Sequence, residues 1–325
     1  MTSYLIRRIV ALIPVLIGIT VISFGVMHLA PGRPTDAATD LNVKVSLEAR
    51  ERLNQLYGLN DPLPVQYGRW VGRLARGDFG ASFHDGRPVL AKIAERVPIT
   101  LGINLCALLL TLAVAVPLGL ATAARAGSRL DRGVTTLLLI VFSAPSFWLA
   151  LLALGFFGVE LRWVPVSGLQ TLLADRWPLW RQWLDLGRHL ILPVTILALG
   201  DLVIYTRYLR GNLVEVLQQD YIRTARAHGL PPRRVLYRHA LRNALLPFIT
   251  MLGFALPGLL GGSVILESLF GIPGLGRLFY DGVMGRDYPV IMGLVVLGAV
   301  LTLAGNLLAD LAYAVADPRI RYNER

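Results

Sequence analysis

Charged residues and cysteine are scarce in this 325-residue sequence. Only 16% of the residues are Asp, Glu, Lys or Arg, whereas 54% are hydrophobic and the mean hydropathy is +0.57. This composition is typical of an integral membrane protein. The single cysteine excludes an intrachain disulfide. Because Cys106 falls within an apolar run, we expect it to be a small buried hydrophobic residue.

The sequence also lacks any arrangement of residues that supports chemistry. Its five histidines are scattered with no pair at the spacing of metal ligands, and no nucleophile stands near a base or paired acids. The glycine-rich segment 267–276 lacks the Lys and Ser or Thr of a phosphate-binding loop, and no strand precedes it. We therefore predict no catalytic residue, no metal site and no cofactor in this chain.

Long uncharged stretches account for the high hydropathy. Each is long enough for a membrane span of about 20 residues. Five of them are Ile9–Leu29, Val97–Ala124, Gly133–Val159, Ala244–Leu266 and Tyr288–Ala309. A sixth, Leu190–Thr206, is interrupted only by Asp201. The pattern predicts an all-α integral membrane protein with six transmembrane helices.

The formal charge of +11 is unevenly distributed along the chain. With the N-terminus inside, half of the 32 Lys and Arg residues fall in cytoplasmic segments, eight of them between Arg207 and Arg242. The short outer loops hold only six, and the long first loop does not count because long loops cross regardless of charge. We predict that both termini are cytoplasmic, and that the basic charge marks topology instead of nucleic-acid binding.

These spans divide the chain into four predicted regions. Residues 1–30 form a cytoplasmic end and a first helix, which we expect to be retained because its apolar run exceeds that of a signal peptide. Residues 31–96 form an outer loop domain. Residues 97–313 form the transmembrane core, and 314–325 a cytoplasmic tail.

The outer loop domain contains two candidate helices. Ser46 can cap a helix that ends near Gly58. Val65–Leu74 places Tyr67, Trp70, Val71 and Leu74 on one stripe, which suits a helix lying at the membrane interface.

The most informative segment is the basic loop 207–243 between two spans. Polar loops of this length are usually functional. Within the stretch that starts at Asp220, a short helix is predicted to stop at Gly229, which Leu230, Pro231 and Pro232 follow, and a second helix to restart at Arg233. Small residues surround its arginines, so another protein surface can approach the backbone closely. The segment is predicted to be a docking element.

This segment resembles the cytoplasmic loop of permease subunits of binding-protein-dependent ABC importers, in the oligopeptide, dipeptide and nickel branch. Where the general family has Glu-Ala-Ala before the glycine, this chain has Arg223-Thr224-Ala225, as is usual in the peptide branch. The resemblance implies a type I ABC importer permease fold, with an outer loop domain after the first helix. It also implies that the short helix couples to an ATPase. The implied coupling residues are Asp220, Tyr221, Arg223, Thr224, Ala225, Arg226, Ala227, Gly229 and Leu230.

Other segments extend the resemblance over nearly the whole chain. Gly77-Asp78-Phe79-Gly80 and Arg286-Asp287-Tyr288-Pro289 are similar to outer segments of the family. For Asp78, Phe79, Arg286 and Asp287 this leaves two readings: docking of the external solute-binding protein, or packing over the helix ends. The segment from Glu267 to Gly276 resembles the family's scoop-like connection, which implies that Glu267 lies near the translocation path.

Asp201 is the one acid deep in a predicted span. A charge there is costly, so such residues usually face a cavity or a partner. Three readings stay open: Asp201 lines the path and meets a substrate amino group, it pairs with an Arg of a neighbouring helix, or it is neutral.

The resemblance implies the permease subunit of an ATP-driven importer in a bacterial or archaeal inner membrane. Its implied partners are a second homologous permease, two ATPase subunits that bind ATP and Mg, an extracytoplasmic solute-binding protein and membrane lipids, with no nucleic acid. Di- or oligopeptides are the expected cargo, with nickel chelates or another small solute as the alternative. An ion-coupled secondary transporter and a non-transporting scaffold are the alternatives from other classes.

Overall fold

The computed structural model describes residues 2–29, 60–253, 255 and 257–316. The predicted helix after Ser46 and the tail from Asp317 lie outside the described residues. Within these ranges all regular elements are helical, and the nearest approach to a sheet is a single bridge between Ala81 and Pro88. The all-α prediction is confirmed.

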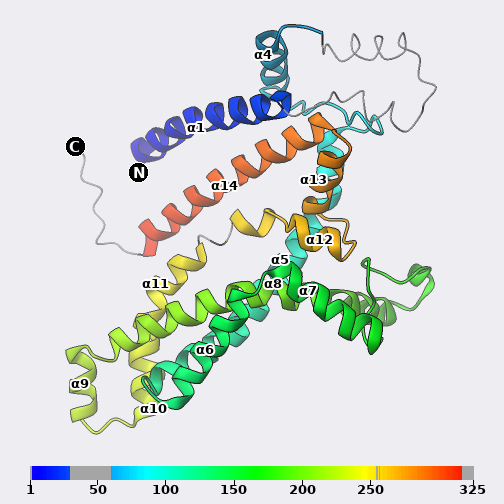
Figure 1. Cartoon of the computed structure of the whole chain (residues 1–325). Helices are drawn as coiled ribbons and strands as arrows, with labels where there is room; N and C mark the ends of the chain where they lie inside the picture. Colours follow the sequence, from blue (N-terminus) through cyan, green and yellow to red (C-terminus); the bar gives the residue numbers. More distant parts are fainter. Residues whose placement is uncertain (1, 30–59, 254, 256, 317–325) are drawn as a thin grey trace. The chain divides into compact units, whose positions relative to one another are not determined.

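The helices follow one another along the chain as Figure 1 colours them, with η marking short π or 3₁₀ turns. In order they are α1 (Thr2–Leu29), α4 (Leu63–Leu74), α5 (Val89–Ala124), α6 (Arg129–Ser143), α7 (Ser146–Ala153), η1 (Leu154–Glu160), η2 (Ala174–Arg176), α8 (Leu179–Val216), α9 (Asp220–Ala227), α10 (Pro232–Arg234), η3 (Val235–Ala240), α11 (Leu241–Gly253), η4 (Pro257–Leu260), α12 (Val264–Leu269), α13 (Leu275–Met284) and α14 (Tyr288–Ala316).

Four of these helices, α1, α5, α8 and α14, are long and apolar enough to cross a membrane. Two broken pairs bring the number to six if each pair forms one span: α6 with α7 and η1, and the α10–α11 segment with η4 and α12. All six predicted uncharged stretches fall in these elements. With 36 and 38 residues, α5 and α8 extend well past them, and at 1.5 Å per residue both exceed the hydrocarbon core.

The 92° bend between α6 and α7 has a local cause. Ala144 is extended, with φ −84° and ψ 132°, as steric contact with the following proline favours. Pro145 then caps α7, since its fixed φ suits a helix start and it has no N–H to leave unpaired. Pro193, in contrast, lies inside the continuous helix α8. A proline in these spans therefore does not by itself predict a break.

The chain folds into two compact units. The first comprises residues 1–100, 260–264 and 273–307, and the second residues 101–259, 265–272 and 308–325. The predicted boundaries at 30, 96 and 313 concern sides of the membrane and stay predictions.

In the first unit, α4 packs on α1 and α14. Trp70 is 6% exposed and clusters with Phe24, Tyr288 and Met292. The Thr20 and Tyr67 hydroxyls are 3.0 Å apart. The apolar stripe of α4 was expected at the membrane interface. The Trp70 indole is instead buried against other helices of the same chain, and the position of α4 relative to the membrane stays a prediction.

In the second unit, α5 and α8 lie close together. A Cβ on Gly119 would come within 3.2 Å of Leu209, and Thr111 Oγ1 donates to the Ala198 carbonyl at 3.2 Å. Cys106 on α5 is exposed, so the expectation that it is buried is wrong. An apolar run does not reveal which side of a long helix faces its own chain.

Candidate functional site

The predicted docking element forms the short helix α9, which follows directly from α8 (Figure 1). Gly229 has a φ of +73°, as a glycine after a helix end permits. The Leu230 amide donates to the Ala225 carbonyl at 3.4 Å and the Gly229 amide to the Arg226 carbonyl at 2.9 Å. This pair of bonds is a Schellman motif, so the predicted stop at Gly229 is confirmed.

A buried side chain fixes α9 to the helices behind it. Ile222 is 0% exposed and belongs to an apolar cluster with Leu213 of α8 and Val235 of η3. Ala225 and Leu230 pack partly buried against the same cluster. One face of α9 is therefore occupied by the chain's own core.

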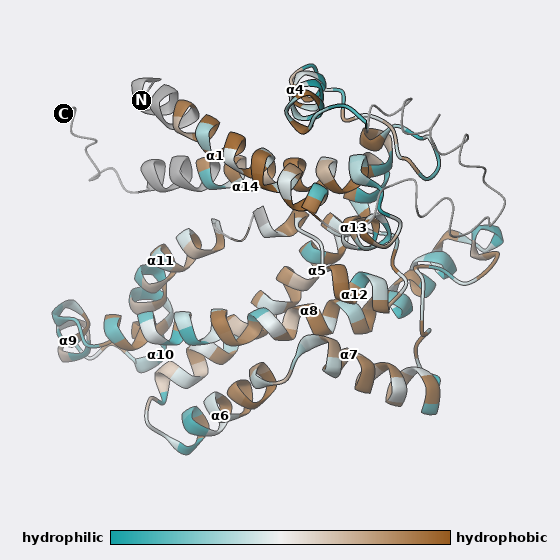
Figure 2. Cartoon of the chain, turned by 45° about the horizontal axis from the view of Figure 1, so that its top comes forward, coloured by the Kyte–Doolittle hydropathy of each residue, from teal (hydrophilic) through white to brown (hydrophobic). Residues whose placement is uncertain are grey.

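The opposite face of α9 is open and polar. Asp220, Arg223, Thr224 and Ala227 are exposed. Arg223 Nη1 lies 3.2 Å from Asp220 Oδ1, and Thr224 Oγ1 donates to the Asp220 carbonyl. Figure 2 shows hydrophilic residues on α9 and α10, in contrast to the hydrophobic α7. The surface that α9 offers to another molecule consists of these side chains.

The coupling residues predicted from the sequence do not all share this open face. Ala225 is half-buried, whereas Tyr221 is 42% exposed and its hydroxyl accepts from Asn243 Nδ2 at 2.6 Å. A Cβ on Gly229 would meet no atom of the chain within 4 Å. The coupling role of these residues stays a prediction, but Ala227 is the small residue best placed to test it.

An ion pair beside this loop was missed by the sequence reasoning. Asp131 of α6 is 3% exposed and accepts from Arg210 of α8 at 2.6 Å through both Nε and Nη2. It also accepts from the Gly127 amide at 2.8 Å, while Ser128 Oγ caps the helix by accepting from the Asp131 amide. The spacing of Ser128 and Asp131 resembles a capping box and was the available signal.

The predicted outer platform is held together by Asp287. This carboxylate is 4% exposed and accepts from the Ser82 hydroxyl and from the Phe83 amide, the latter at 3.0 Å. Residues 82 and 83 are thereby bound to the start of α14. Arg286, directly before it, is half-buried and has a φ of +52°. Asp287 thus acts within the chain, while a docking role stays a prediction.

Asp78 and Phe79 shape the turn before α5. Asp78 is exposed and accepts from the Gly80 amide at 2.8 Å. Phe79 packs against a cluster that contains Val89, Ile93 and Val290. Asp78 is therefore the predicted platform residue most open to a partner.

The charges that follow this turn are paired within the chain. Lys92 Nζ lies 2.7 Å from Asp85, and Arg87 Nη2 lies 2.5 Å from Glu95. Burial alone would raise the pKa of Asp85, but hydrogen bonds from Lys92, the Arg87 amide and Ser82 lower it to about 2. The hydrogen bond to Glu95 raises the pKa of Arg87 further above its usual value.

The two acids assigned to the translocation path differ in exposure. Asp201 lies on an exposed side of α8, and no ion pair joins it to another described residue. Glu267 in α12 is only 6% exposed, and its carbonyl accepts from the Ile272 amide at 2.8 Å. Its burial weighs against direct contact with a solute in this conformation. The path assignment of both acids stays a prediction.

No group of three or more His, Cys, Asp or Glu that fits a metal ion occurs among the described residues. The predictions that the chain has no catalytic residue and no cofactor stay predictions.

Comparison with known proteins connects these features. Residues 115–322 match the family model of binding-protein-dependent transport system inner membrane components, and residues 1–104 match the model of the N-terminal part of such membrane components.

Proteins similar to the chain over its whole length have related names. The oligopeptide transport system permease protein AppB of Bacillus subtilis is 46% identical over 99% of this chain and 100% of its own length. A putative peptide transport system permease protein of Brucella abortus is 41% identical over the same shares. A probable peptide ABC transporter permease protein of Sinorhizobium fredii is 37% identical over 99% of this chain and all of its own.

A solved structure with a similar fold is the MetNI methionine ABC transporter in an inward-facing conformation. The TM-score is 0.55 at 20% identity, covering 70% of this chain and 96% of that one. At this identity the likeness shows the fold alone, and it confirms the predicted importer permease fold.

Proposed function

The chain belongs to the family of binding-protein-dependent transport system inner membrane components, and from this premise we propose that it is the permease subunit of an ATP-driven importer of di- or oligopeptides. Permeases named for peptide transport that align over 99% of this chain support the cargo class. The other candidate cargoes, nickel chelates and small solutes, have no comparable support. Family membership also argues against a secondary transporter and a scaffold.

The observation that carries this function is the build of α9. A helix of eight residues stands at the end of the long helix α8, attached through the fully buried Ile222 and closed by the Gly229 turn. Its other face presents exposed polar and small side chains. A rigidly attached helix with an open face suits force transfer from an ATPase, because movement of α9 must move the core behind it.

We propose two ATPase subunits, a second permease subunit and an extracytoplasmic solute-binding protein as the partners. ATP and Mg are bound by the ATPases, so this chain contributes no hydrolytic site. The excess of Arg in segment 207–242 supports placing α9 and both termini in the cytoplasm of a bacterial or archaeal cell. The turn at Asp78 then faces the binding protein.

The coupling role is tested by Ala227→Arg. Ala227 is exposed on α9 and Arg is a good helix former, so the chain itself should fold and insert normally. A long charged side chain at a docking surface should release the ATPase or uncouple hydrolysis from uptake. The measurements are co-purification of the ATPase and uptake of a labelled dipeptide into proteoliposomes.

Ala126→Arg is the matched control. Ala126 is also exposed, in the turn before α6, and should leave both measurements at wild-type levels. Ser128 is a poor control because its hydroxyl caps α6. Wild-type coupling in Ala227→Arg would overturn the assignment of α9.

For Asp201 we propose a position at the translocation path or at the second permease. Its exposure on α8 in a single subunit favours this over a pairing within the chain. Asp201→Asn should reduce dipeptide uptake by about tenfold if the carboxylate meets the cargo's amino group. Unchanged uptake together with a lower yield of assembled complex would assign Asp201 to the interface between permeases.

A further inference from the structure

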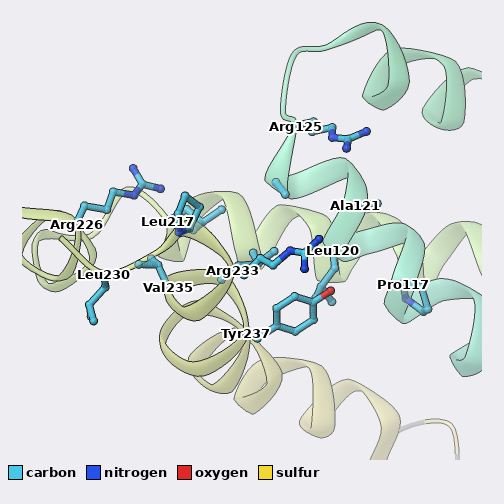
Figure 3. A pocket seen from close by; sticks show the side chains of 13 residues that line it. Pro117, Leu120, Ala121, Arg125, Leu217, Arg226, Leu230, Arg233, Val235 and Tyr237 are labelled. Atoms are coloured by element: carbon cyan, nitrogen blue, oxygen red, sulfur yellow. The ribbon is translucent and has the colours of Figure 1, made fainter.

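A cavity of about 510 Å³ lies behind α9, within the second compact unit. Three arginines line it, and each comes from a different segment: Arg125 follows α5, Arg226 belongs to α9 and Arg233 to α10. In Figure 3, Arg233 and Tyr237 extend from the returning segment toward Leu120 of α5. The cavity thus joins the end of α5 to two elements of the coupling loop.

The other part of the lining is apolar. Pro117, Leu120 and Ala121 contribute from the last turns of α5, and Leu217 and Leu236 from the loop. The α5 residues belong to the uncharged stretch 97–124, which is predicted to span the membrane. The cavity therefore extends from basic side chains at the loop to apolar side chains at the inner end of a span.

Among the residues that the structure describes, no acid compensates the charge of the cavity. Its lining contains no Asp or Glu. Among the described residues no ion pair involves Arg125, Arg226 or Arg233, whereas Arg210 and Arg223 are paired with Asp131 and Asp220. Three like charges around one cavity repel each other, so an anion bound between them would be favoured.

The mixture of arginines and apolar side chains in the lining indicates which kind of anion fits the cavity. Guanidinium groups present forked N–H donors that match the oxygens of a phosphate, and a phenol hydroxyl can add a further bond. A free phosphate would leave the apolar part of the cavity empty. An acidic side chain of the ATPase would also leave the apolar part empty. An amphiphile with a phosphate head and an acyl chain fills both parts.

We propose that this cavity binds one anionic phospholipid, with its phosphate between Arg125, Arg226 and Arg233 and an acyl chain along Pro117, Leu120 and Ala121. The bound lipid links the end of α5 to α9 and α10. It would therefore help to hold the coupling helix in place, so that coupling would depend on anionic lipid.

The binding test uses the assembled transporter in nanodiscs of phosphatidylglycerol or of phosphatidylcholine. After the transporter is released from the nanodiscs, native mass spectrometry should find one retained phosphatidylglycerol per permease chain and no retained phosphatidylcholine. The variant Arg125→Gln/Arg233→Gln should lower phosphatidylglycerol retention at least tenfold, because it removes two charged hydrogen-bond donors. Arg226 is left unchanged because it is also a predicted coupling residue.

Arg234→Gln is the matched control, since it makes the same charge change next to Arg233 at a residue that does not line the cavity. It should retain the lipid as the wild type does. Equal loss in Arg234→Gln, or equal retention of the two lipids, would overturn the site in favour of a general basic surface.

A second variant separates a lipid from a free anion. Ala121 is exposed and lines the apolar part, so Ala121→Phe should obstruct the acyl chain while leaving the three arginines in place. Phosphatidylglycerol retention should fall, and added inorganic phosphate should not displace the lipid from the wild type. Displacement by millimolar phosphate with no effect of Ala121→Phe would overturn the lipid. If no lipid is retained and the Arg125→Gln/Arg233→Gln variant loses the ATPase, the cavity would be assigned to the ATPase instead.

Discussion

Two connections in this protein differ in how their charged residues are paired. In the outer segment from Asp78 to Glu95, the cations bind acids of the same chain: Lys92 pairs with Asp85 and Arg87 with Glu95. In the loop from α9 to η3, Arg223 pairs with Asp220, while Arg226 and Arg233 have no ion-pair partner among the described residues. We call the outer segment closed, because its cations are paired with acids of the same chain, and the loop open, because Arg226 and Arg233 have no ion-pair partner among the described residues.

The two segments differ in their numbers of charged residues: residues 78–95 contain three acids and two cations, whereas residues 220–240 contain one acid and five arginines. Asp287, far along the sequence, reaches the Ser82 hydroxyl and binds the outer turn to α14. In the second unit the buried carboxylate of Asp131 is engaged by Arg210 and not by an arginine of the α9–η3 loop. The open loop is therefore suited to partners, and the closed one to a fixed platform. Four experiments test this contrast.

The largest expected effect is an all-or-none difference in labelling from the two sides of the membrane. In a Cys106→Ala background, Ala81→Cys should react with an impermeant maleimide added outside, and Ala227→Cys only with reagent added inside. Both positions are exposed, whereas Ser82 is 1% exposed and unsuited to labelling. The replacement of Cys106 is necessary because that thiol is exposed too. Labelling of both positions from one side would refute the assigned topology.

A large effect is expected where the open loop is anchored. Ile222→Ala removes a fully buried side chain and should cost about 2–5 kcal/mol, which would loosen α9 from its core. The midpoint temperature of thermal unfolding of the permease should fall, and less ATPase should co-purify with it. Arg223→Ala, on the exposed face, should leave unfolding unchanged. If the two variants unfold at the same temperature, the Ile222 contact does not hold α9.

A moderate effect is expected at the closed platform. Asp287→Ala leaves the Ser82 hydroxyl and the Phe83 amide without their acceptor and should cost about 1–3 kcal/mol. Limited proteolysis near residue 83 should become faster. The control is Asp281→Ala, whose carboxylate is 56% exposed and should be nearly neutral. Equal proteolysis of both variants would contradict a closing role for Asp287.

The smallest effect is a pH dependence. The pKa of Asp85 is lowered from 3.8 to about 2, so its ionised form is favoured in the folded protein. Its contribution is complete above about pH 4 and is lost as the pH falls toward 2. Because its side chain is 35% exposed, we expect less than about 1 kcal/mol. Asp85→Asn should flatten the stability curve between pH 4 and 2, and an unchanged curve would remove Asp85 from the platform.

Local patterns predicted much of the candidate site. Gly229 followed by two prolines indicated the end of α9, and its φ of +73° agrees, because a backbone that turns left-handed almost requires glycine. Helix geometry places residues 222 and 225 on one face, but the sequence could not show that this face is the buried one, since its burial comes from contact with α8 and η3.

Hydropathy and the distribution of Arg were enough to predict a multi-helix membrane protein and the docking loop, because a span of uncharged residues is a property of consecutive positions. Contacts between distant positions were not accessible in this way. The burial of Trp70, the pairing of Asp131 with Arg210 and the three arginines around one cavity all join residues far apart in the chain. Their energies exist only once helices pack, so folding decides which charges are neutralised and which stay open to a partner.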